Sequence, residues 1–133
     1  MTFKSLAGRE VKVKKSYVYK IDWQGNSLSK LQRSVKKELA KYWEADIVYE
    51  EFPVAGTRLN FDFYNATKNI VLEVDGHQHY RYNKFFHGQN RFNFLQQLKR
   101  DNDKEKFCDL NGIKLHRVRE GEDYKQVLSE LDL

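Results

Sequence analysis

Three strand-like runs, at residues 47–52, 59–64 and 70–75, constrain the fold of this chain most strongly. The first two are rich in aromatic residues and the third in aliphatic ones, as is typical of strands. Two short segments separate the runs, Val54-Ala55-Gly56-Thr57 and Asn65-Ala66-Thr67-Lys68-Asn69, and the second is rich in turn-forming residues. We therefore predict three consecutive antiparallel strands.

Helical patterns flank these strands. A Ser29-x-x-Gln32 capping box begins a helical repeat of apolar residues that ends near Trp43. A second helix is predicted over 89–110, because the pair Asn111-Gly112 is typical of a helix end. A strand at 113–118 and a short helix at 123–131, capped by Asp123, close the chain. The predicted order is α-β-β-β-α-β-α, an α/β fold with a mixed sheet.

The length and composition fit one domain. A chain of 133 residues, 40% hydrophobic and 32% charged, can bury one core but is too short for two. We predict a basic arm at 1–28, a core at 29–119 and a C-terminal helix at 120–133. The single cysteine, Cys108, excludes an intramolecular disulfide, and the sequence shows neither a secretory signal nor a membrane-spanning run. These features predict a cytoplasmic protein without a membrane partner.

Positive charge is concentrated near the N-terminus. Residues 1–43 contain eleven lysines and arginines against three acidic residues. The segment 11–21 partly alternates apolar and cationic residues, which favours a half-exposed strand or hairpin arm. On such a strand Lys12, Lys14 and Lys20 would share one face that could contact a phosphate backbone. An edge strand whose lysines only prevent aggregation would give the same pattern.

Carboxylates occur on the second and third predicted strands. The two-residue repeat of a strand sends Asp62 to one face and Leu59, Phe61 and Phe63 to the other. The same rule puts Glu73 and Asp75 together, opposite the face that carries Ile70, Leu72 and Val74.

Neighbouring carboxylates repel one another unless a cation intervenes, and oxygen ligands suit Mg²⁺, with Mn²⁺ as a substitute. The predicted metal ligands are therefore Asp62, Glu73 and Asp75. The alternative is that Asp75 belongs to an Asp-Gly turn and that Glu73 is merely exposed.

Two more carboxylates fall on the apolar stripes of the predicted helices. Glu38 lies within the stripe of Leu31, Val35 and Tyr42, and Asp101 lies within the stripe of Phe94, Leu98 and Cys108. A carboxylate on a buried helix face needs a partner. Both residues are therefore candidates for a role in the site.

Histidines follow the third predicted strand. His79 is close enough in sequence to the proposed metal to exchange a proton there near neutral pH, whereas His77 fits a solvent-facing loop. A zinc site formed by His77, His79 and His87 is the alternative. The H-x-H spacing is a weak signal for it, and only one cysteine is present.

The same motifs resemble a known family. Phe61-Asp62-Phe63 followed by Leu72-Glu73-Val74-Asp75-Gly76-His77-Gln78-His79 is similar to the "DF … E-V-D-G-x-x-H" signature of the very-short-patch-repair-like endonucleases, in the PD-(D/E)xK nuclease superfamily. The run Asp101-x-x-Lys104, Phe107-Cys108, Asn111-Gly112-Ile113 and Leu115-His116-Arg117-Val118 matches the closing motif of that group. The resemblance covers roughly residues 29–119 and implies a restriction-endonuclease-like core. One departure is that Asp75 replaces the lysine of E-x-K.

The resemblance implies a metal-dependent DNA endonuclease, encoded by a phage or mobile element, that hydrolyses phosphodiester bonds. Asp62 would be the central metal ligand, and Glu73 and Asp75 would complete the site. His79 would act as base or acid, with Asp101 orienting it. Glu38 would bind a metal through water or hold Lys104.

Aromatic and cationic residues fill the segment 80–94, YRYNKFFHGQNRFNF. Such a mixture can stack on bases and bind phosphate, so Arg81, Lys84 and Arg91 are predicted DNA contacts. The alternative is that the phenylalanines of this segment belong to the core: Phe85, Phe86, Phe92 and Phe94.

Two other functions stay open. One is a catalytically inactive nucleic-acid-binding module with the same fold, although the carboxylates and His79 are all retained. The other is a nuclease that acts on RNA or on branched DNA, since a fold does not choose a substrate. Sequence preference would come from the basic arm, the loop after His79, a second copy of the chain in a homodimer, or a separate DNA-targeting partner.

Overall fold

The strands form one four-stranded sheet and one short hairpin in the computed structural model, which describes residues 1–76 and 89–133. The elements, in chain order, are β1 (Thr2–Lys4), β2 (Glu10–Lys12), the 3-10 helix η1 (Ser16–Tyr19), α1 (Lys30–Trp43), β3 (Val48–Pro53), β4 (Asn60–Asn65), β5 (Ile70–Asp75), α2 (Gln89–Leu110), β6 (Lys114–Arg119) and α3 (Tyr124–Glu130). Strands β1 and β2 form the hairpin, and the larger sheet has the order β3-β4-β5-β6.

The larger sheet is mixed. Strands β3, β4 and β5 pair antiparallel, whereas β6 pairs parallel with β5 after the chain crosses over through α2. The predicted α/β class and the order of its core elements are therefore confirmed. None of the helices in the described ranges combines the length and apolar character needed to cross a bilayer.

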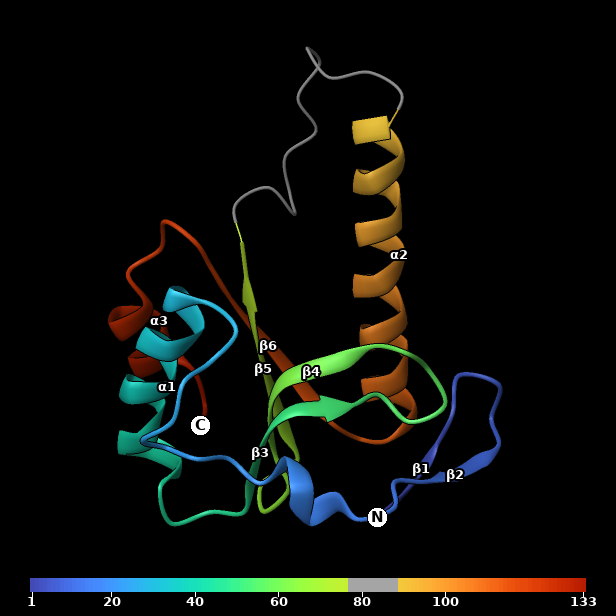
Figure 1. The fold of residues 1–133 in the computed structure, drawn as a ribbon, viewed down its shortest axis with the longest axis horizontal. Coiled ribbons are helices and arrows are strands. Elements are labelled where there is room, and N and C mark those ends of the chain that lie inside the picture. The colour runs from blue at the N-terminus through green and yellow to red at the C-terminus, as the bar shows by residue number, and fades with distance from the viewer. Residues whose placement is uncertain (77–88) are drawn as a thin grey trace.

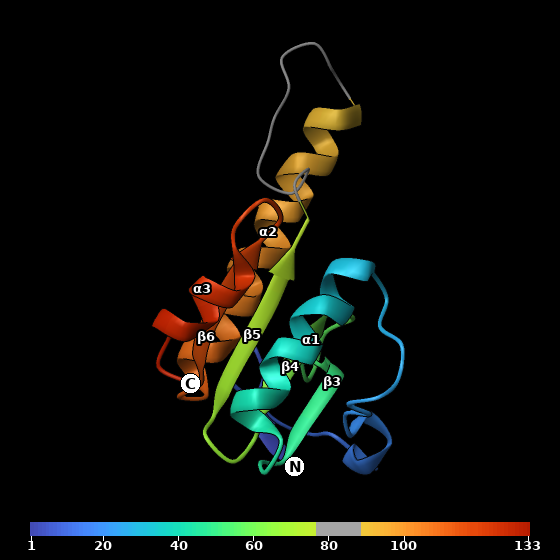
Figure 2. The ribbon, with the colours of Figure 1, turned by 90° about the vertical axis from the view of Figure 1, so that its left-hand side faces the viewer.

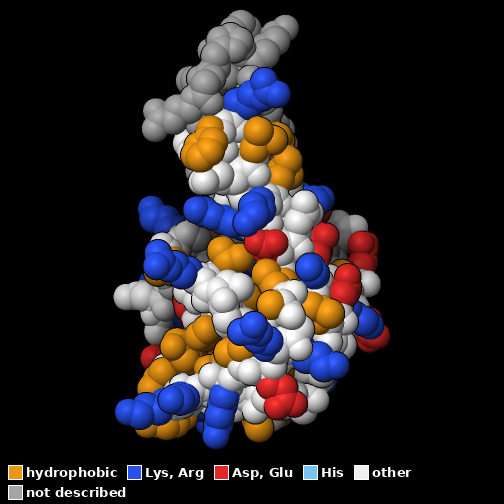
Figure 3. Space-filling view, turned by 90° about the vertical axis from the view of Figure 1, so that its right-hand side faces the viewer, with side chains coloured by type: hydrophobic (Ala, Val, Ile, Leu, Met, Phe, Trp, Pro, Cys, Tyr) orange, Lys and Arg blue, Asp and Glu red, His pale blue; other side chains and the backbone are white. Residues whose placement is uncertain are grey.

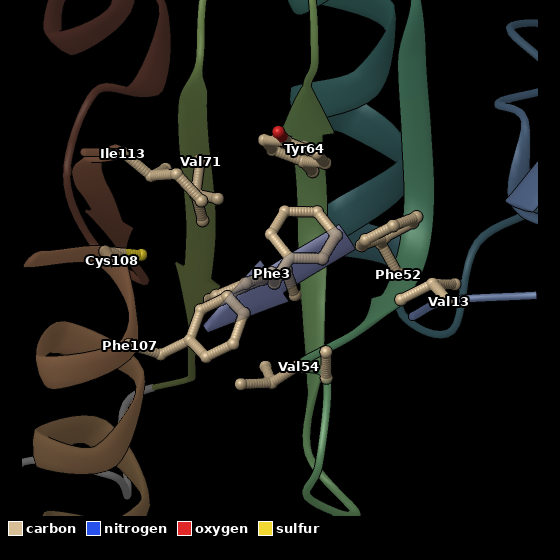
Figure 4. Close-up of a cluster of buried hydrophobic side chains, with 11 residues drawn as sticks. Phe3, Val13, Phe52, Val54, Tyr64, Val71, Phe107, Cys108 and Ile113 are labelled. Atoms are coloured by element: carbon tan, nitrogen blue, oxygen red, sulfur yellow. The ribbon is translucent and has the colours of Figure 1, made fainter. Parts of the chain in front are cut away.

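Helices cover both faces of this sheet. Helices α1 and α3 pack on one face, and α2 lies on the other together with the hairpin (Figures 1 and 2). The α1 side buries Leu39, Trp43 and Leu128. On the α2 side the hairpin residue Phe3 packs against Phe52 and Phe107, with ring centroids 5.9 and 5.7 Å apart (Figure 4). The sheet is thus the middle of three layers.

Most predicted boundaries agree with the structure. The predicted bounds of β5 and α2 are those observed, and β3, β4 and β6 each begin one residue later than predicted. Ser29 caps α1 by accepting a hydrogen bond from the Gln32 amide over 3.0 Å. Gly112 follows α2 with a φ of 64°, a left-handed conformation that glycine adopts without strain.

The predicted strand at 11–21 is wrong beyond its first residues. Strand β2 ends at Lys12, Lys15 adopts a left-handed conformation with a φ of 52°, and η1 follows. This turn replaces the extended backbone that the alternation predicted. Lys12, Lys14 and Lys20 are all exposed, but they do not share one strand face.

The predicted alternation is confirmed for β5 and wrong for β4. Phe61 packs in the cluster on the α2 side, whereas Phe63 packs in the cluster on the α1 side. Because helices cover both faces of the sheet, apolar residues on β4 do not identify a single buried face. The strand shifts its alternation at Asp62.

The buried face of α1 is also rotated from the prediction. Gln32 and Lys36 are buried, whereas Tyr42, predicted to lie in the apolar stripe, is 37% exposed. Lys36 has a partner on β3, because its Nζ lies 3.0 Å from Glu50 Oε1. A polar residue can therefore occupy the buried face of this helix.

Candidate active site

The site lies where β4 and β5 separate. Their backbone pairing includes Phe63 with Leu72 and continues away from Asp62 and Glu73. At the point where that pairing stops, the Asp62 amide donates to Glu73 Oε2 over 2.7 Å, and the Val74 amide donates to Asp62 Oδ2 over 2.7 Å. The two carboxylates thus accept the hydrogen bonds that backbone carbonyls accept in a regular sheet. We call this place, where β4 and β5 separate next to Asp62 and Glu73, the fork of the sheet.

Lys104 on α2 completes this group. Its Nζ donates to Glu73 Oε1 in an ion pair in which the Glu73 side chain is 2% exposed and the Lys104 side chain 15% exposed. The structure therefore brings together three of the residues predicted for the site: Asp62, Glu73 and Lys104. The cation of this group thus comes from helix α2.

The surroundings of Asp62 disfavour the charged form of its carboxyl group. Burial raises the pKa of Asp62 well above its ordinary value, and repulsion by Glu73 raises it further. The hydrogen bond from Val74 and the charge of Lys104 oppose these effects without cancelling them. A bound cation would relieve the repulsion.

Asp75 and Asp101 belong to a neighbouring group around Arg117. The Arg117 Nη1 atom lies 3.4 Å from Asp75 Oδ2 and 3.5 Å from Asp101 Oδ1, and all three side chains are at least 88% buried. Gln97 also donates to Asp101 Oδ1 over 3.2 Å, while Asp101 Oδ2 is buried and has no hydrogen-bond partner among residues 1–76 and 89–133. Asp75 thus already has a cationic partner. Arg117 appeared in the closing sequence motif without a role.

Glu38 lies outside both groups. Its carboxylate pairs with Lys41 over 3.0 Å, and Lys104 pairs with Glu73 instead. The α1 residue that reaches toward the site is Gln32, whose side-chain amide donates to Glu50 Oε2 over 2.9 Å and to Glu51 Oε1 over 3.0 Å. The first-helix carboxylate that the resemblance implied is therefore not where it was expected.

Glu51 on β3 is a site residue that the sequence analysis missed. Its backbone has a φ of 53°, which costs a non-glycine residue about 1–3 kcal/mol. Burial raises the pKa of Glu51, the Gln32 hydrogen bond lowers it, and repulsion by Glu50 and Glu73 raises it further. Within the run 47–52 no signal distinguished Glu51 from an ordinary strand residue.

The donor set suits a hard cation, but the predicted set of three ligands is not assembled. Both Glu73 oxygens accept hydrogen bonds from protein donors, and Asp75 pairs with Arg117. In the described ranges, no group of three or more His, Cys, Asp or Glu residues is arranged to hold a metal ion. Asp62 remains suitable, because proteins commonly bind Mg²⁺ through one or two carboxylates and leave the other positions to water and phosphate.

The predicted nucleic-acid contacts are exposed where the structure describes them. Lys12, Lys14, Lys20 and Arg91 are exposed, and Figure 3 shows lysine and arginine side chains spread over the face that α2 and the hairpin form. Phe92 is 58% exposed, which excludes it from the core. Phe94 on α2 is half-buried. Seven further residues of this region lie outside the described residues: His77, His79, Arg81, Lys84, Phe85, Phe86 and His87.

Two viral proteins are among the relatives of this chain. It is 38% identical over 66 residues to "Uncharacterized protein 033L" of Invertebrate iridescent virus 3, an alignment that covers 50% of this chain and 34% of the relative. It is 36% identical over 66 residues to "Uncharacterized protein 094L" of Frog virus 3, with 50% and 43% covered. The chain spans less than half of either relative. It matches no model of a protein family, and no solved structure matches it.

Proposed function

We propose that this chain is a metal-dependent endonuclease that hydrolyses phosphodiester bonds in DNA, with a restriction-endonuclease-like core and Mg²⁺ as its cofactor. The observation that carries the proposal is the group at the fork of the sheet, where Asp62 lies beside Glu73 and Glu73 pairs with Lys104. Burial and repulsion make the charge of Asp62 costly without a cation. The sequence motifs that resemble the nuclease family contain the same three residues.

Each residue has a distinct role in this proposal. Asp62 would hold the cation, which when bound neutralises phosphate charge and lowers the pKa of water. Glu73 keeps the Asp62 backbone and the Lys104 ammonium in place through its two oxygens. Lys104 places a positive charge next to the carboxylates, where it can stabilise negative charge on a phosphate or a hydroxide. His79 remains the candidate for proton transfer.

The proposal also includes the DNA contacts, the origin and the partners of the chain. Lys12, Lys14, Lys20 and Arg91 would contact the DNA backbone, because all four cations are exposed. The viral relatives support a viral or mobile-element origin. A homodimer or a separate DNA-targeting partner would select the sequence, and the reaction would take place in the cytoplasm.

The test is a cleavage assay on supercoiled plasmid, linear duplex, single-stranded DNA and RNA, with Mg²⁺, Mn²⁺ or EDTA. We expect metal-dependent cutting of DNA that Asp62→Asn and Lys104→Met reduce to the EDTA background. Asp46→Asn is the matched control, because Asp46 also pairs with a lysine, Lys68 at 3.4 Å, but contacts the far end of β4. Equal cutting by Asp62→Asn and wild type would refute the proposal.

A catalytically inactive nucleic-acid-binding module is the second candidate. It is favoured by the commitment of both Glu73 oxygens to protein donors, because a closed network of this kind can be purely structural. The same assay separates the two functions. Binding of DNA by wild type without cutting under any metal condition would support the binding module and exclude the endonuclease.

A further inference from the structure

We propose that Glu51, and not Glu73 or Asp75, supplies the second carboxylate oxygen to the cation that Asp62 binds. This inference rests on the proposed function, because it assigns a ligand of the same metal site. Glu51 lies on β3, the strand next to the one that carries Asp62. Strand β3 pairs Glu50 with Phe63 and Phe52 with Phe61, so Glu51 and Asp62 both lie between these two pairs, where the pairing of the strands is interrupted. Residues at matched levels of neighbouring antiparallel strands lie close together.

Both strands change their alternation at this pair. On β3, Tyr49 and Phe52 pack in the same cluster although they are three positions apart, and on β4 Phe61 and Tyr64 do the same. The left-handed backbone of Glu51 lies inside this shift. The other non-glycine residues with positive φ in the described ranges, Lys15 and Asn69, lie outside strands. The distortion therefore coincides with the level at which neighbouring strands each carry an acidic residue.

Glu51 and Asp62 each keep one oxygen open. Asp62 uses Oδ2 for the Val74 amide, and Glu51 uses Oε1 for Gln32, which leaves Asp62 Oδ1 and Glu51 Oε2 without a donor in the described part of the chain. The buried atoms that lack a partner there are Trp43 Nε1, Asp101 Oδ2 and His116 Nε2, so neither open oxygen is among them. Both residues are half-buried, so neither side chain is fully enclosed.

The other carboxylates are already occupied. Glu73 accepts hydrogen bonds at both oxygens, and Asp75 lies 3.4 Å from Arg117. The charge of Glu51 disfavours the charge of Asp62, and both residues also experience the charges of Glu73 and Lys104. A divalent cation between Asp62 and Glu51 would remove that repulsion, and two carboxylates with water are a usual set of ligands for Mg²⁺. Gln32 would hold Glu51 in place without adding charge.

The test measures cation binding directly, by calorimetric titration of the full chain with Mn²⁺ in the absence of DNA. We expect Glu51→Gln and Asp62→Asn to weaken Mn²⁺ binding at least about tenfold. Asp46→Asn should bind as wild type does, because Asp46 contacts Asn65 and Lys68 at the far end of β4. If Glu51→Gln does not fold, Glu51→Gly replaces it, because glycine adopts a positive φ without strain and carries no carboxylate.

Cleavage of plasmid by the same variants separates this inference from the proposed function. If wild type cuts DNA with Mg²⁺ but Glu51→Gln binds Mn²⁺ as tightly as wild type, the role of Glu51 is refuted and the endonuclease stands. If Glu51→Gln weakens Mn²⁺ binding and wild type cuts nothing, the ligand assignment stands and the endonuclease does not. A wild-type chain that binds no Mn²⁺ refutes the ligand assignment.

Discussion

The carboxylates of Asp62 and Glu73 each accept a backbone hydrogen bond from the other residue's strand. The Asp62 amide donates to the Glu73 carboxylate, and the amide of Val74, next to Glu73, donates to the Asp62 carboxylate, each over 2.7 Å. The sheet can therefore open between β4 and β5 without leaving a buried amide unpaired. Because the same two carboxylates stabilise the fold and form the candidate site, stability and activity need separate measurements in every variant.

Asp62→Asn should raise the stability of the metal-free protein near neutral pH. A carboxyl whose folded-state pKa is raised stabilises the fold while it is protonated, and that stability is lost as the pH rises through the folded pKa. Asparagine has the same shape and carries no charge. Urea unfolding of both proteins from about pH 4 to pH 8 should show an advantage of the variant that grows with pH.

Addition of Mg²⁺ provides the control for this experiment. A cation that binds only the folded wild type stabilises it by mass action, so the gap between the two proteins should narrow. A wild type that is more stable than Asp62→Asn across the whole pH range without metal would show that the charge of Asp62 is compensated within the protein.

Sequence patterns predicted the strands that form the site better than they predicted its side-chain contacts. The bounds of β5 and the common face of Glu73 and Asp75 are visible in the sequence, because both acidic residues of β5 alternate with Leu72 and Val74. The face of Phe61 was not predictable, because residues on both sides of β4 are apolar.

The contacts of Arg117 and Glu51 depend on how distant elements pair. Parallel pairing places Arg117 opposite Glu73, and antiparallel pairing brings Glu51 and Asp62 to the same level of neighbouring strands. Neither pairing can be recognised from the periodicity of the sequence. The buried Lys36 is a further example, since its partners, Glu50 and the Asn26 carbonyl, explain why a lysine lies on the buried face of α1.

Lys104→Met should destabilise the protein strongly. Removal of the ammonium leaves the Glu73 carboxylate, 2% exposed, without its charged partner, and the breaking of a buried ion pair costs about 3–5 kcal/mol. Lys68→Met is the matched control, because Lys68 is 41% exposed and its pair with Asp46 should contribute no more than about 1 kcal/mol. Urea unfolding measures both variants.

The double variant Lys104→Met/Glu73→Gln tests the cause of that loss. It removes the unpaired charge and keeps a hydrogen-bonding side chain for the Asp62 amide. We expect it to be more stable than Lys104→Met alone. Equal stability of the two variants would mean that Lys104 contributes through packing and not through its charge.

Arg117→Met should also destabilise the fold, because Asp75 and Asp101 both lie within 3.5 Å of the Arg117 guanidinium and are buried. The loss should be about 3 kcal/mol or more, the cost of leaving buried carboxylates without their cation. Arg58→Met serves as the control, because Arg58 is exposed. Thermal unfolding compares the two variants, and a shift no larger than that of Arg58→Met would exclude a structural role for the Arg117 charge.

Neutralisation of the hairpin cations should weaken DNA binding and lower its dependence on salt. Lys12 and Lys14 are exposed at the end of the hairpin strand β2, on the layer that contains α2. Each lysine that contacts a phosphate contributes about one unit to the slope of log affinity against log salt. The double variant Lys12→Gln/Lys14→Gln should therefore reduce that slope by about two, as measured by fluorescence anisotropy on a labelled duplex.

A second double variant, Lys30→Gln/Lys125→Gln, separates contact from net charge. It changes the total charge by the same amount, but both lysines lie on the opposite layer, on α1 and α3. We expect it to keep the wild-type slope. If both double variants weaken binding and lower the slope equally, the lysines act only through net charge and the hairpin is not the surface that contacts DNA.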